Sequence, residues 1–121
     1  MKNFITLLML LLPIILVGQD YAMFSTQYLT PKPGHEAALG EELAEHARAY
    51  HNEGPHTYSV FFVNDGPNGG DFFVVAGPHT YTDLDSRPSG AAHRRDWWQV
   101  TAHCEKVHTK EKWRLDADLS M

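Results

Sequence analysis

Residues 90–108 bring together several side chains that can do chemistry: three histidines, two adjacent tryptophans and the only cysteine of the chain. If this segment is one helix, steps of four and three residues place five side chains on one stripe: His93, Trp97, Val100, Cys104 and Val107. His93 stands at the start of that stripe, where a neutral imidazole can act as a general base. We therefore predict His93 as a catalytic residue.

His46 is a second candidate, on an earlier segment. Residues 35–50 read as an amphipathic helix in which four side chains recur at steps of four, three and four: Leu39, Leu43, His46 and Tyr50. His46 then faces inward, and we predict it as a second catalytic residue. The alternative for both histidines is a purely structural role, as hydrogen-bonded residues of the core or of its boundary.

Asp96 follows His93 by three residues, so its carboxylate could orient the His93 imidazole. Arg94 and Arg95 stand directly before it and could pair with it instead. A helix position next to two arginines favours the second interpretation, in which Asp96 faces solvent.

The eight histidines also raise the question of a metal site. Zinc signatures have two histidines four residues apart or paired cysteines, whereas His46 and His51, like His103 and His108, are five apart. Five residues on a helix correspond to about 500° of rotation, so such side chains diverge. We therefore expect no metal site and no cofactor, and we expect Cys104 to be a buried, unreactive thiol.

The elements that must position these residues follow from periodicity and from Gly and Pro breakers. We expect strands at 21–30, 57–64, 71–76 and 111–115, helices at 35–50 and 90–108, a hairpin loop at 65–70 and a helical turn at 82–85. The order strand, helix, strand, strand, helix, strand predicts an α+β fold of the ferredoxin-like βαββαβ type. In that arrangement an antiparallel sheet carries both helices on one face.

The second and third expected strands are apolar on both faces, in the runs 60–63 (VFFV) and 72–75 (FFVV). A sheet with one face in water alternates apolar and polar residues instead. The simplest cover for the second face is the same sheet of another copy, so we predict a homodimer.

The element order, the stretch PKPGHEAA (31–38) before the first helix and the hairpin loop resemble the dimeric α+β barrel superfamily. That superfamily includes antibiotic-biosynthesis monooxygenase-like domains and some heme-degrading monooxygenases, and the resemblance covers residues 21–119. It implies a ligand cavity between the sheet and the two helices. The expected ligand contacts are Trp97, Tyr50 and a residue of the first strand, where Tyr28 and Gln27 lie on opposite faces and either one could point into this cavity.

The heme-degrading relatives pair an Asn of the first strand with a Trp and with a His of the second helix. Here His93 and Trp97 resemble two members of that trio, but the first strand offers Gln27 in place of the Asn. This departure from the heme-degrading pattern argues against heme chemistry.

The N-terminus reads as a secretory signal. Residues 1–3 carry a charge, and residues 4–17 form an apolar run that Pro13 interrupts and that is shorter than the ~20 residues a spanning helix needs. We expect cleavage after Gly18 or Gln19, which divides the chain into a signal (1–19) and a single domain (20–121); a retained N-terminal anchor is the alternative. The mature protein is then secreted or periplasmic, with no membrane attachment.

Charge and cysteine content limit the partners. Loss of Lys2 with the signal changes the formal net charge from −5 to −6, and no basic stripe is present to neutralise phosphates, so nucleic acid is excluded as a partner. One cysteine makes no internal disulfide.

These observations predict an exported homodimer that binds a small molecule. Our first hypothesis is a cofactor-free monooxygenase-like or isomerase-like enzyme with His93 as general base. The second is a non-catalytic ligand-binding or stress-related module that uses the same pocket, and the third is a heme or metal binder.

Overall fold

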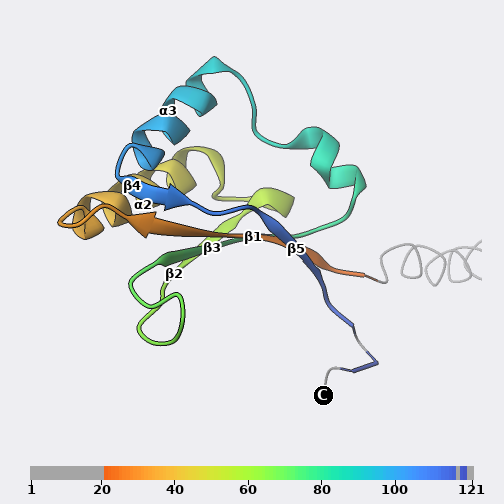
Figure 1. The fold of residues 1–121 in the computed structure, drawn as a ribbon. Coiled ribbons are helices and arrows are strands. Elements are labelled where there is room, and N and C mark those ends of the chain that lie inside the picture. Colours follow the sequence, from red (N-terminus) through yellow and green to blue (C-terminus); the bar gives the residue numbers. More distant parts are fainter. Residues whose placement is uncertain (1–20, 117, 120–121) are drawn as a thin grey trace, which may run out of the picture.

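The protein forms an antiparallel sheet with its helices on one face, in a computed structural model that describes residues 21–116 and 118–119 (Figure 1). The elements are β1 (Met23–Pro31), α2 (Glu36–Tyr50), β2 (Tyr58–Phe62), β3 (Phe72–His79), α3 (Ala91–Thr101), β4 (Cys104–Val107) and β5 (Glu111–Arg114), with 3₁₀ turns η1 (Gly54–His56) and η2 (Thr82–Ser86). The strand order is β2-β3-β1-β4, and β5 also pairs with β1. This is the predicted ferredoxin-like α+β fold.

The outer edge of β1 is shared between two short strands. β4 pairs with the half of β1 that ends at Pro31, and β5 pairs with the half that begins at Met23. The expected last strand at 111–115 is therefore confirmed as β5, and β4 is an additional strand.

The prediction of one helix over 90–108 was wrong. α3 ends at Thr101, and the chain turns at Ala102 and His103 before it pairs with β1 as β4. The His103 carbonyl accepts a hydrogen bond from Lys32 N at 2.9 Å. Pairing with the free edge of β1 satisfies the backbone groups of the segment, and this tertiary opportunity overrides the helical periodicity.

The helix-covered face of the sheet carries the core, which consists of Leu29, Leu39, Leu43, Val74, Val100 and Cys104. Leu39 and Leu43 are fully buried and come from the predicted stripe of α2. Full burial of such a side chain stabilises the fold by roughly 1.5–3 kcal/mol. The stripe that packs α2 against the sheet therefore also fixes the depth of His46, which follows Leu43 by one turn.

The opposite face of the sheet carries a row of aromatic side chains and, among the described elements, no helix (Figure 1). Tyr28, Phe73 and Phe61 pair across β1, β3 and β2, and the rings of Tyr28 and Phe73 stack with centroids 4.6 Å apart. These residues alternate with Leu29 and Val74 of the core, so they point away from the helices. We call Tyr28, Phe61 and Phe73 the open-face row; Phe61 is 55% exposed.

The predicted signal, residues 1–19, lies outside the described residues. Of the helices in the described part of the chain, none has the length and apolar character that crossing a membrane requires.

Candidate functional site

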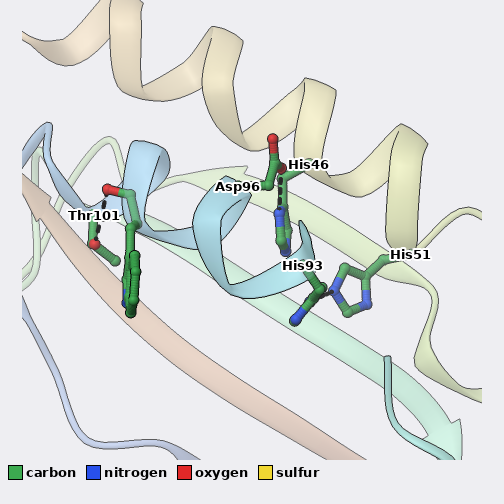
Figure 2. Close-up of polar contacts among 6 residues, drawn as sticks. His46, His51, His93, Asp96 and Thr101 are labelled. Atoms are coloured by element: carbon green, nitrogen blue, oxygen red, sulfur yellow. Dashed lines mark hydrogen bonds and ion pairs between the residues drawn. The ribbon is translucent and has the colours of Figure 1, made fainter. Parts of the chain in front are cut away.

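Three histidine rings meet where the C-terminal end of α2 passes the first turn of α3 (Figure 2). His46 comes from α2, His51 caps the C-terminus of α2, and His93 comes from α3. The ring centroid of His46 lies 4.9 Å from that of His93 and 5.0 Å from that of His51. His46 is fully buried, His51 is 6% exposed and His93 is half-buried.

His51 joins this cluster because the helix ends just before it. Its backbone leaves the helical conformation, with φ −137° and ψ 38°, while its N–H still donates to Ala47 O at 2.8 Å. The prediction that His46 and His51 diverge was wrong, because it assumed that the helix continues through both. The structure thus brings together the two predicted catalytic residues and a third histidine that the spacing argument had set aside.

His46 is held by a carboxylate from the other helix. Its Nδ1–H donates to Asp96 Oδ2 at 2.6 Å, the contact drawn as a dashed line in Figure 2. Asp96 therefore orients the imidazole of His46, not that of His93. The Asp96 side chain stays 28% exposed. The Nε2 atom of His46 is buried without a hydrogen-bond partner among the described residues; in a neutral imidazole that donates from Nδ1, this is the atom that carries the lone pair.

His51 is held by a backbone carbonyl and by a ring. Its Nδ1–H donates to His56 O at 2.8 Å, and its ring stacks on Tyr58 with centroids 3.6 Å apart. Its Nε2 atom then faces the Nε2 atom of His93 at 3.4 Å. The imidazole nitrogens of His46, His51 and His93 that can bind a ligand all lie within 4.8 Å of one another.

The surroundings of the cluster disfavour the protonated form of two of its rings, those of His51 and His93. Burial is the main cause that lowers the pKa of His51 to about 4, and the neighbouring histidines lower it further. Burial also lowers the pKa of His93, as do His46 and Lys110, while the Asp96 carboxylate opposes that shift. Burial raises the pKa of Tyr58 to about 12, so its phenol remains protonated.

A pocket of about 360 Å³ opens beside the cluster, and His51 and His93 form part of its wall. Ligand sites commonly have volumes of about 300–1,000 Å³, so this pocket suits a small molecule. Three cationic side chains, Arg87, Lys110 and Lys112, also line it, against a single carboxylate, that of Asp85. Burial lowers the pKa of Lys110, and repulsion from Arg87 and from Lys112 lowers it further. An anionic ligand group would relieve that repulsion.

Two further buried histidines line the pocket, and both are satisfied. His56 Nε2–H donates to Asp83 O at 2.8 Å, and His79 Nδ1–H donates to Pro55 O at 3.3 Å. Ser25 Oγ–H can then donate to His79 Nε2 at 3.2 Å. These contacts fasten η1 and the segment of η2 over the sheet, so His56 and His79 shape the pocket.

The other residues predicted as ligand contacts take different places. The ring of Trp97 lies 5.3 Å from that of His46 and packs against the core, and the ring of Tyr50 lies 4.9 Å from that of His93, edge to face. Both support the cluster from outside the 360 Å³ pocket. Tyr28 belongs to the open-face row, and Gln27 donates from Nε2 to His108 O at 2.8 Å at the sheet edge. Neither lines this pocket.

The residues that the sequence reasoning missed are His51, Lys110 and Lys112. His51 could have been found by asking where the helix ends, since Asn52 and Gly54 follow it closely. The two lysines carry no local signal, because only the pairing of β5 with β1 brings Lys112 opposite Ser25 on the pocket side of the sheet.

No protein-family model and no curated protein matches the sequence. Solved structures with the same fold do match. They include Rv0793 from Mycobacterium tuberculosis (TM-score 0.54, 16% identity, 78% of this chain and 93% of that one). An antibiotic biosynthesis monooxygenase matches with TM-score 0.54 and 14% identity over 78% of this chain and 97% of that one. A candidate antibiotic biosynthesis monooxygenase from Deinococcus radiodurans matches with TM-score 0.55 and 16% identity over 82% and 95%.

Proposed function

The chain has the fold of the antibiotic biosynthesis monooxygenase-like proteins, and from that premise we propose that its pocket binds a small acidic or enolisable organic molecule. We further propose that His93 removes a proton from this molecule, as the first step of a monooxygenase-like or isomerase-like reaction. One observation carries the proposal: the His93 imidazole and three cationic side chains line the same pocket, which has a single carboxylate, that of Asp85.

The division of labour follows from the chemistry of proton removal. His93 is half-buried at the pocket wall, where its imidazole can reach a bound molecule and accept a proton. Proton removal leaves an enolate or phenolate, and Lys110, Lys112 and Arg87 would stabilise its negative charge.

The resulting anion is electron-rich, so it can pass electrons to O₂ in a monooxygenation. It can equally take the proton back at another carbon in an isomerisation. The names of two structural neighbours favour the first outcome.

The test uses naphthol as a binding probe and dihydroxynaphthalene as a turnover probe, with protein that has been treated with a chelator. Naphthol binding is followed by its fluorescence, and turnover by O₂ consumption. We expect His93→Ala to lose turnover while it still binds naphthol, and Lys110→Ala to weaken naphthol binding. His103→Ala is the matched control, since it removes a histidine just beyond α3 that does not line the pocket. Unchanged turnover in His93→Ala would remove the proposed base.

We also propose that the protein is a homodimer that pairs through the open-face row. Phe61, Phe73 and Tyr28 present a continuous apolar strip on the uncovered face of the sheet, with Phe61 55% exposed. A second copy of the same face would bury this strip by two-fold symmetry. Its test is the solution mass, given in the Discussion.

Export is the third part of the proposal, and the apolar run of residues 4–17 supports it. Expression of the full chain in a bacterial host, followed by fractionation and N-terminal sequencing, should recover a form that begins near Gln19 or Asp20 outside the cytoplasm. Recovery of the intact N-terminus in the membrane fraction would favour a retained anchor instead.

A further inference from the structure

We infer that the Nε2 atoms of His46, His51 and His93 bind one divalent transition-metal ion, with a fourth coordination position open to the pocket. This inference goes beyond the proposed function and does not depend on it, because an ion can bind here whether or not the pocket performs a reaction.

The donor geometry is already close to that of a metal site. Two imidazole nitrogens bound tetrahedrally at 2.0–2.1 Å from zinc lie about 3.3–3.4 Å apart. The Nε2 atoms of His51 and His93 are separated by 3.4 Å. The ligand nitrogens of the trio lie at most 4.8 Å from one another. Side-chain rotations that move each nitrogen by about an ångström would therefore bring all three onto one ion.

The unpaired nitrogen of His46 is the second observation that points to a ligand. Its side chain is fully buried, and its Nε2 atom has no hydrogen-bond partner among the described residues. A buried lone pair without a partner is unfavourable, and native structures seldom leave one. A metal ion at the centre of the trio would satisfy it.

The surrounding hydrogen bonds orient the trio as ligands. Metal-binding histidines typically donate their other ring N–H to a carboxylate or to a backbone carbonyl, which fixes the tautomer. His46 donates from Nδ1 to the Asp96 carboxylate, and His51 donates from Nδ1 to His56 O. In both rings the nitrogen left with a lone pair is the one that faces the trio.

The donor set also indicates the class of metal. Three neutral imidazoles suit Zn²⁺, Cu²⁺ or Ni²⁺ better than Mg²⁺ or Ca²⁺, which prefer oxygen ligands. Three protein ligands with one open position are typical of catalytic zinc sites, whereas structural zinc sites use four. His51 and His93 line the pocket and His46 lies behind them, so the open position faces the pocket.

Metal binding would change which group accepts the proton in the proposed reaction. With an ion bound, the lone pair of His93 would be engaged, and the ion would lower the pKa of a bound water, so that a hydroxide could accept the proton in place of His93. The metal-free and metal-bound proteins therefore differ in the base that they present to the same pocket.

The experiment titrates chelator-treated protein with Co²⁺ and follows the visible d–d bands of the ion, which are intense only in tetrahedral sites. We expect saturation at one ion per chain and bleaching of these bands when Zn²⁺ displaces Co²⁺. His93→Ala should abolish the intense bands. Asp96→Asn should weaken binding by about 10-fold, because a neutral acceptor makes His46 a poorer ligand.

His103→Ala serves as the control, since His103 pairs with His35 (Nδ1 to Nδ1, 3.0 Å) away from the trio. Circular dichroism checks that each variant is folded, and the titration of the unmodified protein does not depend on any variant. Absence of saturable Co²⁺ binding by the unmodified protein overturns the inference. It is also overturned if His103→Ala loses Co²⁺ binding while a folded His93→Ala keeps it. The titration contains no organic molecule, so the two proposals can fail separately. Naphthol binding and O₂ consumption can persist without Co²⁺ binding, and Co²⁺ can bind when naphthol binding and O₂ consumption are absent.

Discussion

His46 and Asp96 face each other across the contact between α2 and α3, with Nδ1 and Oδ2 2.6 Å apart. The two residues are 50 positions apart in the chain, and the histidine is fully buried while the carboxylate keeps some contact with water. This contact fixes the ring orientation of His46. It also directs the unpaired Nε2 atom toward His51 and His93, so the rest of the candidate site depends on it.

Removal of the Asp96 carboxylate should destabilise the fold. Asp96→Ala leaves the Nδ1–H of His46 buried without its acceptor, and an unsatisfied buried donor costs about 1–3 kcal/mol. Urea unfolding should show this loss in the free energy of unfolding of chelator-treated protein. Asp96→Asn keeps an acceptor oxygen and should lose less; equal stability of the unmodified and Ala proteins would show that the contact is not needed for folding.

The open-face row should hold the dimer together. Phe61→Asp places a charge at the β2 end of the strip, and we expect the mass measured by light scattering to fall from that of a dimer to that of a monomer. Phe62→Asp is a matched control, because Phe62 is 49% exposed but pairs with Phe72 on the helix-covered face of the sheet. A monomeric unmodified protein, or equal effects of the two substitutions, would contradict the proposed interface.

Cys104 should react slowly and should make stability depend on pH in the alkaline range. Burial raises the pKa of its thiol from 9.0 to about 11, although Lys32 opposes the shift. The unfolded chain therefore loses this proton first, so the free energy of unfolding should be constant with respect to this group below about pH 9 and should fall between pH 9 and 11.

Unfolding curves at several pH values and the rate of thiol reaction with Ellman's reagent measure the two effects. The pKa of Tyr58 is raised from 10.0 to about 12, so Tyr58 adds a similar dependence from pH 10 upward. Tyr58→Phe should remove that part and leave the part that belongs to Cys104. A thiol in the native protein that reacts as fast as a free cysteine would show that Cys104 is accessible.

Gly77 occupies a position that should not tolerate a side chain. Its φ is +139°, and a Cβ atom there would lie 2.8 Å from Met23 O. Gly77→Ala should therefore lose more than the ~1–2 kcal/mol that a positive φ alone costs an alanine. Gly34→Ala separates the two effects, because Gly34 also has a positive φ, of +82°, but has open space around its Cβ position. Equal thermal stability of the two variants would show that β1 can move away from residue 77.

The sequence by itself determined the elements whose hydrophobic pattern is local. The stripe of α2 predicted the burial of Leu39, Leu43 and His46, and the breakers around the two-faced strands predicted the ferredoxin-like order. These features follow from the 3.6-residue and 2-residue periods of the backbone, which depend only on neighbours in the chain.

Only the tertiary structure decided the composition of the site. Residues 104–107 pair with the edge of β1 as a strand and do not continue the predicted helix. His51 lies next to His46 because α2 ends there. Asp96 contacts His46 because α3 packs on α2. Each outcome depends on which backbone groups and side chains from distant segments become neighbours. Local periodicity carries no information about such contacts, since a hydrogen bond between residues 50 positions apart leaves no repeat in the sequence.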